Sequence, residues 1–544
     1  MTFIAIAVPV ARADQIGAAL ETARLAKAQG ADLVEWRVDS LAQEPGASSA
    51  VTRLVQDAPL PCIVTVRHVA EGGGFCGTDD QRQQVWAAAC TAHPPAAYVD
   101  VELATYMSDG IAGERARDMS RLGASGNGNG PRVILSFHDF DGRPAGLSAR
   151  IAEMWSDPSS AVSKIVWTAR TPRDNTEAFE VLVGRAKPTI ALCMGEHGLM
   201  SRVLAPKFGG FLTYARSDAQ GTAPGQPTVE ELVQQWGFRS IGPRTRVYGV
   251  LAHPVGHSRS PALHNRWFRE AQVDARLFAI SAGPTWESFK ATLLELLSLD
   301  ALHFSGCAVS VPHKLNAIRF VEERCGVVDA VARCIGAANT ISVAPNGTLC
   351  ATNSDLAGIR DPLLRAAMAQ GWSDGLAGRR ALVLGAGGAG RAAAVALACA
   401  GAEVTMANRT TDRAESVAAD LNASLRSCAT TALSIAARSL LDLGATRFDV
   451  IVQATSAGMS GGDAPDANPL PETVMLTDGM IAMDVVYTPR MTPFLRRAER
   501  AGAHLVEGWS MFVAQAAQQH RQWTGNDPPS TDVCMDMNAD SVSL

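Results

Sequence analysis

The chain has 544 residues, of which 47% are hydrophobic and 19% charged, with a formal net charge of -6. This length exceeds what one hydrophobic core can serve and predicts three or four domains. The charge excludes the basic surface typical of nucleic-acid binding, and no apolar run is long enough to span a membrane. We therefore expect a globular, cytoplasmic protein whose partners are small molecules. No pattern indicates an oligomeric state.

The cysteines and the N-terminus carry two further expectations. The 11 cysteines form no CxxC pair and no Cys/His cluster with zinc spacing. We expect most of them to be buried small hydrophobes in a reducing compartment, and we expect no metal. The apolar residues 1–8 lack a basic leader, so they predict a first strand and not a signal peptide.

Eight short apolar runs alternate with helix-compatible sequence over residues 1–238. The predicted strands are Phe3–Val8, Leu33–Val38, Cys62–Arg67, Tyr98–Leu103, Val133–His138, Lys164–Thr168, Thr189–Met194 and Gly210–Tyr214. The runs are apolar throughout, as strands of a parallel sheet usually are. Eight strands with crossover helices predict an α/β fold of the closed (β/α)8 TIM-barrel type, with an open doubly wound sheet as the alternative.

The second half begins after a short polar hinge, Gly237 to Arg246, which contains Gly242-Pro243 and marks the main boundary. An α/β substrate-binding domain is expected over 247–373, with strands at Phe278–Ile280, Gly306–Val311 and Thr340–Val343. A Rossmann-type domain is expected over 374–524, starting with the strand Arg380–Leu384. The glycine-rich stretch 123–131 predicts a flexible loop, and the polar residues 525–544 predict a disordered tail.

Charged and polar side chains stand at successive predicted strand ends in the first half, where barrels gather their functional residues. Lys164 begins an apolar run. Mostly apolar neighbours would lower the pKa of its amine and leave it nucleophilic, which predicts an imine with a ketone. His138 could then remove the adjacent C–H proton and later protonate a leaving hydroxyl. Three arginines, Arg37, Arg67 and Arg202, could dock a carboxylate and hydroxyls.

Each of these residues alone has a simpler structural explanation. A strand-end lysine often forms a salt bridge, a lone histidine is often structural, and the arginines could pair with Glu35 or Glu102. Their joint arrival at successive strand ends favours a site. A class I aldolase would share the imine lysine and is the alternative chemistry.

The first half resembles type I 3-dehydroquinate dehydratase over nearly all of residues 1–238. The matching stretches are Glu35-Trp-Arg37-Val-Asp39, Thr65-Val-Arg67, Glu71-Gly-Gly, Ser136-Phe-His138-Asp-Phe, Gly198-Leu-Met-Ser-Arg202 and Ala223-Pro-Gly-Gln226. The resemblance implies that Lys164 forms the imine, that His138 is the acid and base, and that Glu71 assists His138. It also implies substrate contacts from Glu35, Arg37, Arg67, Arg202, Thr222 and Gln226, with Thr222 in place of a common serine.

The reaction that this resemblance implies is loss of water from 3-dehydroquinate to give 3-dehydroshikimate. Two of the matching stretches, Glu71-Gly-Gly and Ala223-Pro-Gly-Gln226, argue against an aldolase.

A glycine-rich loop opens the third predicted domain. It comprises Gly385, Ala386, Gly387, Gly388, Ala389 and Gly390, directly after a strand and before a helix of small residues. This context predicts that a dinucleotide pyrophosphate binds at the helix N-terminus. The next strand ends in Asn408, Arg409 and Thr410, with Arg413 one turn further on. NAD sites usually carry an acidic residue here, so the guanidinium predicts NADP, used as NADPH.

The segment before the loop has the residues expected of a substrate half. Ser258 and Ser260 alternate beside a helix start, which suits a carboxylate. Lys314 and Asp355 supply an ammonium and a carboxylate, a plausible pair for moving the alcohol proton as hydride leaves. Taken singly, the serines would be helix caps and the pair a salt bridge.

Residues 247–523 resemble shikimate dehydrogenase. The matching stretches include Ser310-Val-Pro-His-Lys314, Gly336-Ala-Ala-Asn339-Thr340, Asn353-Ser-Asp355, Ala454-Thr-Ser-Ala-Gly458, Asp484-Val-Val-Tyr487 and Gly508-Trp-Ser-Met511. The resemblance implies that Lys314 and Asp355 are the catalytic pair. It implies that shikimate is held by Ser258, Ser260, Ser310, Asn339, Tyr487, Gln515 and Gln519, and that Thr455, Gly508 and Met511 lie at the cofactor. Ala308, Gln453 and Ser354 depart from the common asparagine, asparagine and threonine.

The whole chain resembles the plant-type fusion of these two families. The resemblance implies a lyase and an NADP-dependent oxidoreductase acting in succession in the shikimate pathway, which leads to chorismate and the aromatic amino acids. A dehydrogenase half that prefers quinate is one alternative. A non-catalytic metabolite sensor on the same folds is another, but it would be expected to lose Lys164, His138, Lys314 or Asp355, and all four are present.

Overall fold

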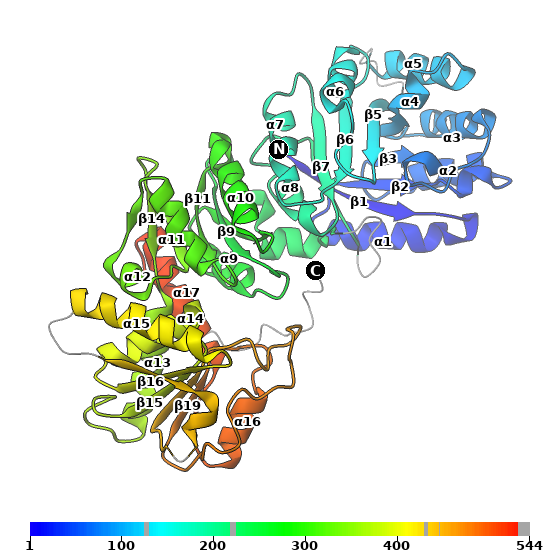
Figure 1. The fold of residues 1–544 in the computed structure, drawn as a ribbon. Helices are drawn as coiled ribbons and strands as arrows, with labels where there is room; N and C mark the ends of the chain where they lie inside the picture. The colour runs from blue at the N-terminus through cyan, green and yellow to red at the C-terminus, as the bar shows by residue number, and fades with distance from the viewer. Residues whose placement is uncertain (125–129, 218–224, 429–433, 445, 531–544) are drawn as a thin grey trace. The chain divides into compact units, whose positions relative to one another are not determined.

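The computed structural model describes residues 1–124, 130–217, 225–428, 434–444 and 446–530 (Figure 1). The chain divides into two compact units. The first comprises Met1–Arg246 together with Thr292–His303, and the second comprises Val247–Ala291 and the described residues from Phe304 onward. No helix in these ranges combines the length and apolarity needed to cross a membrane.

The first unit is built on one eight-stranded sheet in the order β7-β6-β5-β4-β3-β2-β1-β8. Its strands are β1 Phe3–Pro9, β2 Leu33–Arg37, β3 Cys62–Thr65, β4 Tyr98–Glu102, β5 Arg132–Asp139, β6 Val162–Thr168, β7 Thr189–Met194 and β8 Leu212–Ala215. The two ends approach at Phe211, whose N–H donates to Thr189 O at 2.8 Å and whose carbonyl accepts from Phe3 N at 3.1 Å. The sheet is thus a nearly closed parallel barrel, as predicted.

Helices follow the strands and surround the barrel in Figure 1. They are α1 Ile16–Gln29, α2 Ala47–Gln56, α3 Asp79–Thr91, α4 Leu103–Tyr106, α5 Ile111–Ala124, α6 Leu147–Ser156, α7 Asp174–Val183 and α8 Leu199–Val203. A short 3-10 turn, Val69–Glu71, follows β3. The predicted loop at 123–131 lies partly outside the described residues.

The barrel interior changes from apolar to polar along the strands. Every second residue of a strand faces the interior. The first such positions belong to one apolar core cluster, which includes Leu33, Ile63, Tyr98, Ile134 and Val162. The next positions on the same faces are Glu35, Thr65, Asp100, Ser136 and Lys164, and the last include Arg37, Arg67, Glu102 and His138. The barrel interior is therefore apolar at one end and charged at the other. The expectation that the strands are apolar throughout was wrong for five of them.

The second unit begins with a mixed sheet in the order β10-β9-β11-β13-β14-β12. Its strands are β9 Arg246–Ala252, β10 Ala275–Ser281, β11 Phe304–Val309, β12 Val327–Val328, β13 Thr340–Val343 and β14 Leu349–Thr352. The helices that accompany it are α9 Ser260–Glu270, α10 Trp286–Ser298, α11 Lys314–Glu323, α12 Ala330–Ile335 and α13 Asp355–Ala369, and α10 belongs to the first unit from Thr292 onward. Strand β13 pairs antiparallel with β11 and β14, which turns the ends of β11 and β14 toward the same region.

A second six-stranded sheet follows, in the order β17-β16-β15-β18-β19-β20, with every neighbouring pair parallel. Its strands are β15 Arg380–Leu384, β16 Glu403–Asn408, β17 Ile435–Ser439, β18 Val450–Gln453, β19 Ile481–Asp484 and β20 His504–Val506. Its helices are α14 Gly388–Cys399, α15 Thr411–Cys428, α16 Pro493–Arg500 and α17 Gly508–Thr524. This is the doubly wound Rossmann order expected from the sequence.

Helix α17 joins the two sheets of the second unit, because it packs on α13 and also contacts β11, β13 and α9. After α17, Trp267 Nε1 donates to Ser530 O at 2.9 Å. The rest of the predicted tail lies outside the described residues.

The expectation that most cysteines are buried was wrong for those that the structure describes. Four are buried, namely Cys62, Cys193, Cys307 and Cys334, whereas Cys76, Cys325 and Cys399 are exposed and two more are half-buried. The exposed ones lie in a loop after β3 and at the ends of α11 and α14, positions where side chains face solvent.

Two candidate active sites

Lys164 lies inside the barrel at the third residue of β6, on the same face as Val162 and Val166. Its side chain is 4% exposed. The expectation of mostly apolar neighbours was wrong, because Nζ donates to Asp100 Oδ2 at 2.9 Å and to the Tyr214 hydroxyl at 3.0 Å, and lies 3.7 Å from Glu35 Oε1. These partners come from the inner faces of β4, β8 and β2, whose polar positions the strand register brings to the same level.

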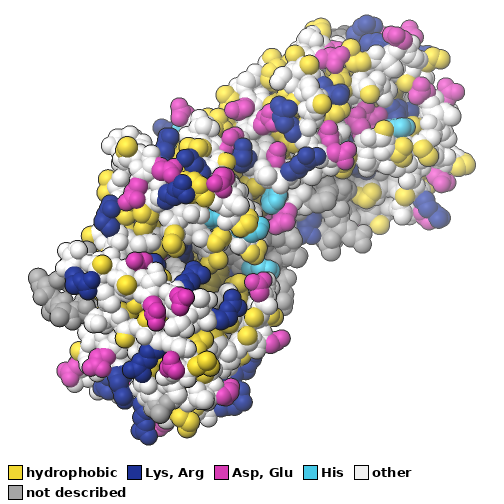
Figure 2. Space-filling model, viewed as in Figure 1, with side chains coloured by type: hydrophobic (Ala, Val, Ile, Leu, Met, Phe, Trp, Pro, Cys, Tyr) yellow, Lys and Arg dark blue, Asp and Glu magenta, His cyan; other side chains and the backbone are white. Residues whose placement is uncertain are grey.

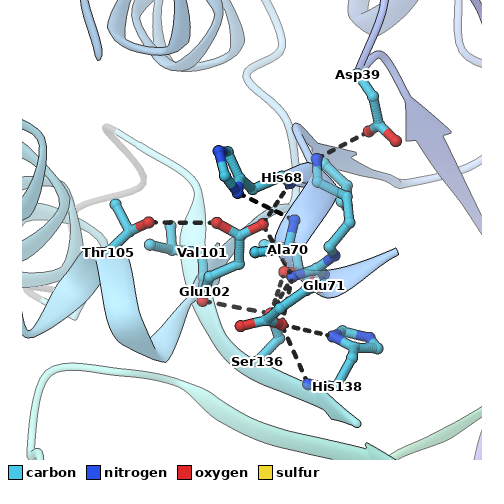
Figure 3. A network of polar contacts seen from close by, with 12 residues as sticks. Asp39, His68, Ala70, Glu71, Val101, Glu102, Thr105, Ser136 and His138 are labelled. Atoms are coloured by element: carbon cyan, nitrogen blue, oxygen red, sulfur yellow. Dashed lines mark hydrogen bonds and ion pairs between the residues drawn. The ribbon is translucent and has the colours of Figure 1, made fainter. Parts of the chain in front are cut away.

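Arg67 is the centre of a buried polar network, of which Glu71, Glu102 and Ser136 are labelled in Figure 3. Its guanidinium donates to Asp100 Oδ1 at 2.6 Å and to Ser136 Oγ at 2.8 Å. Glu71 Oε2 and Glu102 Oε1 lie 3.5 and 3.6 Å away. Three carboxylates of the protein therefore already surround Arg67, and only part of its hydrogen-bonding capacity is open to a ligand.

His138, at the end of β5, is paired with Glu71. Glu71 Oε2 lies 3.0 Å from His138 Nδ1 and accepts the His138 backbone N–H at 3.1 Å (Figure 3). Burial, with the charges of Arg67 and Lys164, lowers the pKa of His138 well below its usual value. Burial raises the pKa of Glu71 to about 7, although Arg67 opposes the shift. The histidine is therefore neutral at neutral pH and able to accept a proton.

A pocket opens over these groups, lined by Glu35, Arg37, Arg67, Glu71, His138, Lys164, Arg202, Tyr214 and Gln226 among others. Arg37 pairs with Asp39 at 2.7 Å. Arg202 is 2% exposed, and no carboxylate of the described chain forms an ion pair with it. Burial lowers the pKa of its guanidinium to about 10. A buried cation without a counter-ion that faces a pocket is suited to bind an anion.

All the residues predicted for the barrel site line this pocket, except Thr222, which lies outside the described residues. Gln226, just beyond that gap, is 8% exposed. Their roles stay predictions.

The second site lies between the two sheets of the second unit. Lys314, the first residue of α11, donates through Nζ to Asp355 Oδ2 at the start of α13. Asn339 holds this carboxylate, since its Nδ2 donates to Asp355 Oδ1 at 2.8 Å and to Ser354 Oγ at 2.9 Å. Gln515 Oε1 lies 3.4 Å from the same Asn339 amide, and Gln519 Nε2 donates to Thr340 Oγ1 at 3.1 Å. The predicted acid–base pair is thus in contact, with two amides of α17 beside it.

The predicted serine cradle lies at the start of α9. The Ser260 N–H donates to Ser258 Oγ at 3.3 Å, and Ser258 also contacts the Tyr487 hydroxyl. Burial raises the pKa of Tyr487, so its hydroxyl is a hydrogen-bond donor at neutral pH. Ser310 follows β11, where its N–H donates to Leu251 O at 2.9 Å.

The glycine loop lies directly against the Lys314 side chain. A Cβ added at Gly388 would lie 2.9 Å from Lys314 Cδ, and one added at Gly390 would lie 2.1 Å from Gly385 O. No side chain caps α14 at Gly387, so the first backbone N–H groups of the helix can receive an anion. The loop therefore offers a pyrophosphate cradle next to the predicted proton donor.

Arg409 and Arg413 lie where β16 passes into α15, next to the glycine loop, because the Gly385 N–H donates to Ala407 O at 2.8 Å. Both side chains are exposed. Thr455 lies on the other side of the loop, with its methyl 3.0 Å from a Cβ added at Gly385. Met511 is buried on α17, and Gly508 begins that helix beside Val486. The donor set fits NADP, since helix N–H groups suit the pyrophosphate and exposed guanidinium groups suit a 2′-phosphate.

Gln453, where the family commonly has asparagine, fixes the loop that carries Thr455. Its Oε1 accepts the Thr455 N–H at 2.5 Å, while Nε2 donates to Ala457 O at 3.0 Å and to Asp484 Oδ1 at 3.3 Å. The longer side chain still holds the loop. Burial raises the pKa of Asp484 to about 7.

Comparisons with known proteins identify both units. Three family models match: type I 3-dehydroquinase over residues 6–243, the shikimate dehydrogenase substrate-binding domain over 250–341, and shikimate/quinate 5-dehydrogenase over 367–460. The bifunctional 3-dehydroquinate dehydratase/shikimate dehydrogenase of Arabidopsis thaliana is 34% identical over 524 residues, which cover 92% of this chain and 79% of that protein.

The chain belongs to the bifunctional 3-dehydroquinate dehydratase/shikimate dehydrogenase family. The NADP-dependent shikimate dehydrogenase of Syntrophobacter fumaroxidans is 36% identical over 291 residues, 53% of this chain and 90% of that protein. A solved structure of the dehydroquinate dehydratase and shikimate dehydrogenase part of S. pombe AroM is 24% identical, covers 97% of this chain and 96% of that one, and has a TM-score of 0.41.

Sequence reasoning missed three buried residues that contact the predicted dehydratase groups, namely Asp100, Tyr214 and Asp39. Asp100 contacts both Lys164 and Arg67, Tyr214 contacts Lys164, and Asp39 accepts the Arg67 N–H at 2.8 Å. For Asp100 and Tyr214, the sequence pattern did indicate a position inside the barrel. Each lies two residues along the inner face from an apolar core residue, Tyr98 or Leu212, so strand periodicity places it inside the barrel.

Proposed function

We propose that this chain catalyses two successive steps of the shikimate pathway. The first unit dehydrates 3-dehydroquinate to 3-dehydroshikimate through an imine on Lys164, and the second reduces 3-dehydroshikimate to shikimate with NADPH. The observation that carries the proposal is that each set of groups is complete within its own unit: Lys164 with His138 and Glu71 in the barrel, and Lys314 with Asp355 beside the glycine loop.

In the barrel, the substrate carboxylate binds Arg202, the buried cation without a counter-ion. Lys164 attacks the ketone, water leaves, and the nitrogen becomes an iminium that withdraws electrons from the neighbouring C–H bond. His138 takes the proton from that carbon and returns it to the departing hydroxyl. Glu71 holds the imidazole through Nδ1, so that Nε2 faces the substrate. Hydrolysis of the product imine restores Lys164.

In the second unit, Ser258 and Ser260 hold the substrate carboxylate, and Tyr487 closes the same end of the site. The glycine loop, Arg409 and Arg413 would hold NADP, which would supply the hydride that the substrate carbon needs. Lys314 donates the proton that the new hydroxyl requires and takes a replacement proton from water, while Asp355 holds the ammonium in place through the ion pair. Asn339 fixes the orientation of Asp355.

Small molecules are the only partners in this proposal, and the cytoplasm remains the expected location. On the face seen in Figure 2, basic and acidic side chains are interspersed. This distribution accords with the modest net charge of -6.

Two single substitutions test the proposal. Lys164→Ala should abolish dehydration and borohydride trapping of substrate, with NADPH-dependent reduction of 3-dehydroshikimate retained. Lys314→Ala should do the reverse. Loss of both activities in either variant would show that the units do not work independently, and retention of dehydration without Lys164 would exclude the imine.

A further inference from the structure

Asp100 lies in the middle of β4 and joins the two cations at the centre of the barrel site. Its carboxylate is fully buried, with 0% side-chain exposure. One oxygen, Oδ2, accepts from Lys164 Nζ at 2.9 Å, while Oδ1 accepts from Arg67 at 2.6 Å and from Ser136 Oγ at 2.6 Å. Both oxygens are therefore used, one on the imine lysine and the other on a cation that faces the substrate pocket.

The contacts keep this carboxylate ionised. Burial alone would raise the pKa of Asp100, but the positive charges of Arg67 and Lys164 outweigh burial and hold it well below its usual range. A carboxylate with two strong donors on one oxygen and an ammonium on the other is a poor base. Asp100 is thus suited to act as a fixed negative charge.

The charge balance of imine formation shows what such a charge can do. The lysine ammonium and the ketone give an iminium and one water, so the C=O bond breaks and the C=N bond forms. The ammonium first loses a proton to become the attacking amine, and that proton returns to the departing oxygen as water leaves. One positive charge therefore lies on nitrogen before and after the step. A fixed anion next to Nζ stabilises the charge before and after the step without exchanging a proton itself. The buried site makes this attraction stronger than it would be in water.

We propose that Asp100 is a positioning residue of the dehydratase site, which aims Lys164 Nζ toward the substrate and serves as the permanent counter-ion of the iminium. This inference rests on the proposed imine function of Lys164. Neutralising Asp100 should therefore slow imine formation while substrate binding persists.

Glu102 provides a matched control on the same strand. It is also a buried carboxylate near Arg67, at 3.6 Å, and its other partners are the His68 N–H at 2.6 Å, Arg82 at 3.2 Å and the Thr105 hydroxyl at 3.2 Å. Its contacts within the described residues do not include Lys164. Glu102→Gln and Asp100→Asn therefore remove the same charge from the same strand, but only the second removes it from the lysine.

The experiment uses the full-length chain with 3-dehydroshikimate, which can form the imine without dehydration, and sodium borohydride to trap it. Intact mass followed over time gives the rate of adduct formation. Asp100→Asn should slow trapping at saturating ligand by at least about tenfold, as expected for loss of a charged hydrogen bond, and should lower kcat for dehydration with KM changed by less than about threefold. Glu102→Gln should trap at a rate within about threefold of the parent.

Trapping of Asp100→Asn at the parent rate would overturn the inference and leave the imine proposal intact. A parent protein that is not trapped at all would instead overturn the proposed function. If Asp100→Asn does not fold, Ser136→Ala tests the same point, because it removes one donor from Oδ1 and leaves the charge. It must then trap at close to the parent rate, and a tenfold loss would overturn the counter-ion role.

Discussion

The Glu71 carboxylate lies 3.0 Å from His138 Nδ1, and the same oxygen accepts the His138 backbone N–H at 3.1 Å. The two residues are 67 positions apart and come from the turn after β3 and the end of β5. This geometry makes the protonation of Glu71 decide which nitrogen of His138 carries the proton. An ionised Glu71 requires the proton on Nδ1, which leaves Nε2 free to act as the base.

The dehydration rate should therefore follow the titration of Glu71. Its pKa is raised to about 7 by burial, so kcat should fall as the pH drops below about 7. In Glu71→Gln the amide oxygen accepts from Nδ1 at every pH, so that decline should disappear, with kcat at pH 8 roughly tenfold lower because the charge is gone. The measurement is kcat between pH 5.5 and 8.5, and a variant that keeps the parent decline would contradict this role.

Glu71 should also affect stability. Its pKa is higher in the folded barrel than in the unfolded chain, so the stabilisation it contributes is present below about pH 4.5 and is lost as the pH rises through about 7. Glu71→Gln should therefore raise the unfolding temperature of the barrel relative to the parent at pH 8 more than at pH 5.

Arg202 should bind substrate at a cost to the stability of the free protein. Arg202→Met removes a buried cation without a counter-ion, so we expect KM for 3-dehydroquinate to rise by roughly 100-fold and the unfolding temperature to rise as well. Arg37→Met is the control, because it leaves Asp39 without the partner that now lies 2.7 Å away and should lower the unfolding temperature. A lower unfolding temperature in Arg202→Met than in the parent would contradict the conclusion that Arg202 lacks a counter-ion.

Arg409 should select NADPH over NADH. Arg409→Glu places a negative charge where the 2′-phosphate is expected, so KM for NADPH should rise by about 10- to 100-fold, with little change for NADH. Arg426→Glu makes the same charge change at an exposed position further along α15 and should leave both constants unchanged. Unchanged NADPH affinity in Arg409→Glu would show that this residue does not select the cofactor.

Two buried histidines should make the second unit sensitive to acid. The His264 ring lies 5.2 Å from that of Trp523, and the His520 ring stacks on Phe268 at 5.6 Å. Burial lowers the pKa of His264 to about 3 and that of His520 to about 4. Both folded pKa values lie below the unfolded value of 6.5. The stability is therefore complete above pH 6.5 and is lost as the pH falls toward 4 and then 3.

Calorimetry of the full chain between pH 7.5 and 4.5 measures this loss of stability. The unfolding transition of the second unit is identified as the one whose temperature NADPH raises. Each histidine should lower the free energy of unfolding by up to about 1.4 kcal/mol per pH unit below 6.5. His520→Phe should reduce the slope, whereas substitution of the exposed His257 by Asn should not. An equal slope in His520→Phe and the parent would contradict the assignment.

Alternation of strands and helices was enough to predict both folds, because the pattern of apolar runs reports burial directly. The eight barrel strands and the glycine loop between β15 and α14 lie where the pattern placed them. Strand ends were less accurate. β6 begins at Val162, two residues before Lys164, so the lysine is an inner-face residue within the strand and not its first residue.

Contacts across the barrel could not be predicted from local pattern. Asp100 meets Lys164 because β4 and β6 curve around one interior, and the two residues are 64 positions apart. Periodicity could place Asp100 inside the barrel but could not identify its partner. The two exposed arginines after β16 were easier to predict, because their expected role depends on position within a single strand–helix unit.

The most direct test of the whole account is to supply purified protein with 3-dehydroquinate as the sole carbon substrate, together with NADPH, and to identify the products by mass. NADPH should be oxidised and shikimate should form, since only the combined action of both sites converts 3-dehydroquinate to shikimate. No oxidation of NADPH would contradict it: accumulation of 3-dehydroshikimate would then place the failure at Lys314 and Asp355, and unchanged 3-dehydroquinate would place it at Lys164.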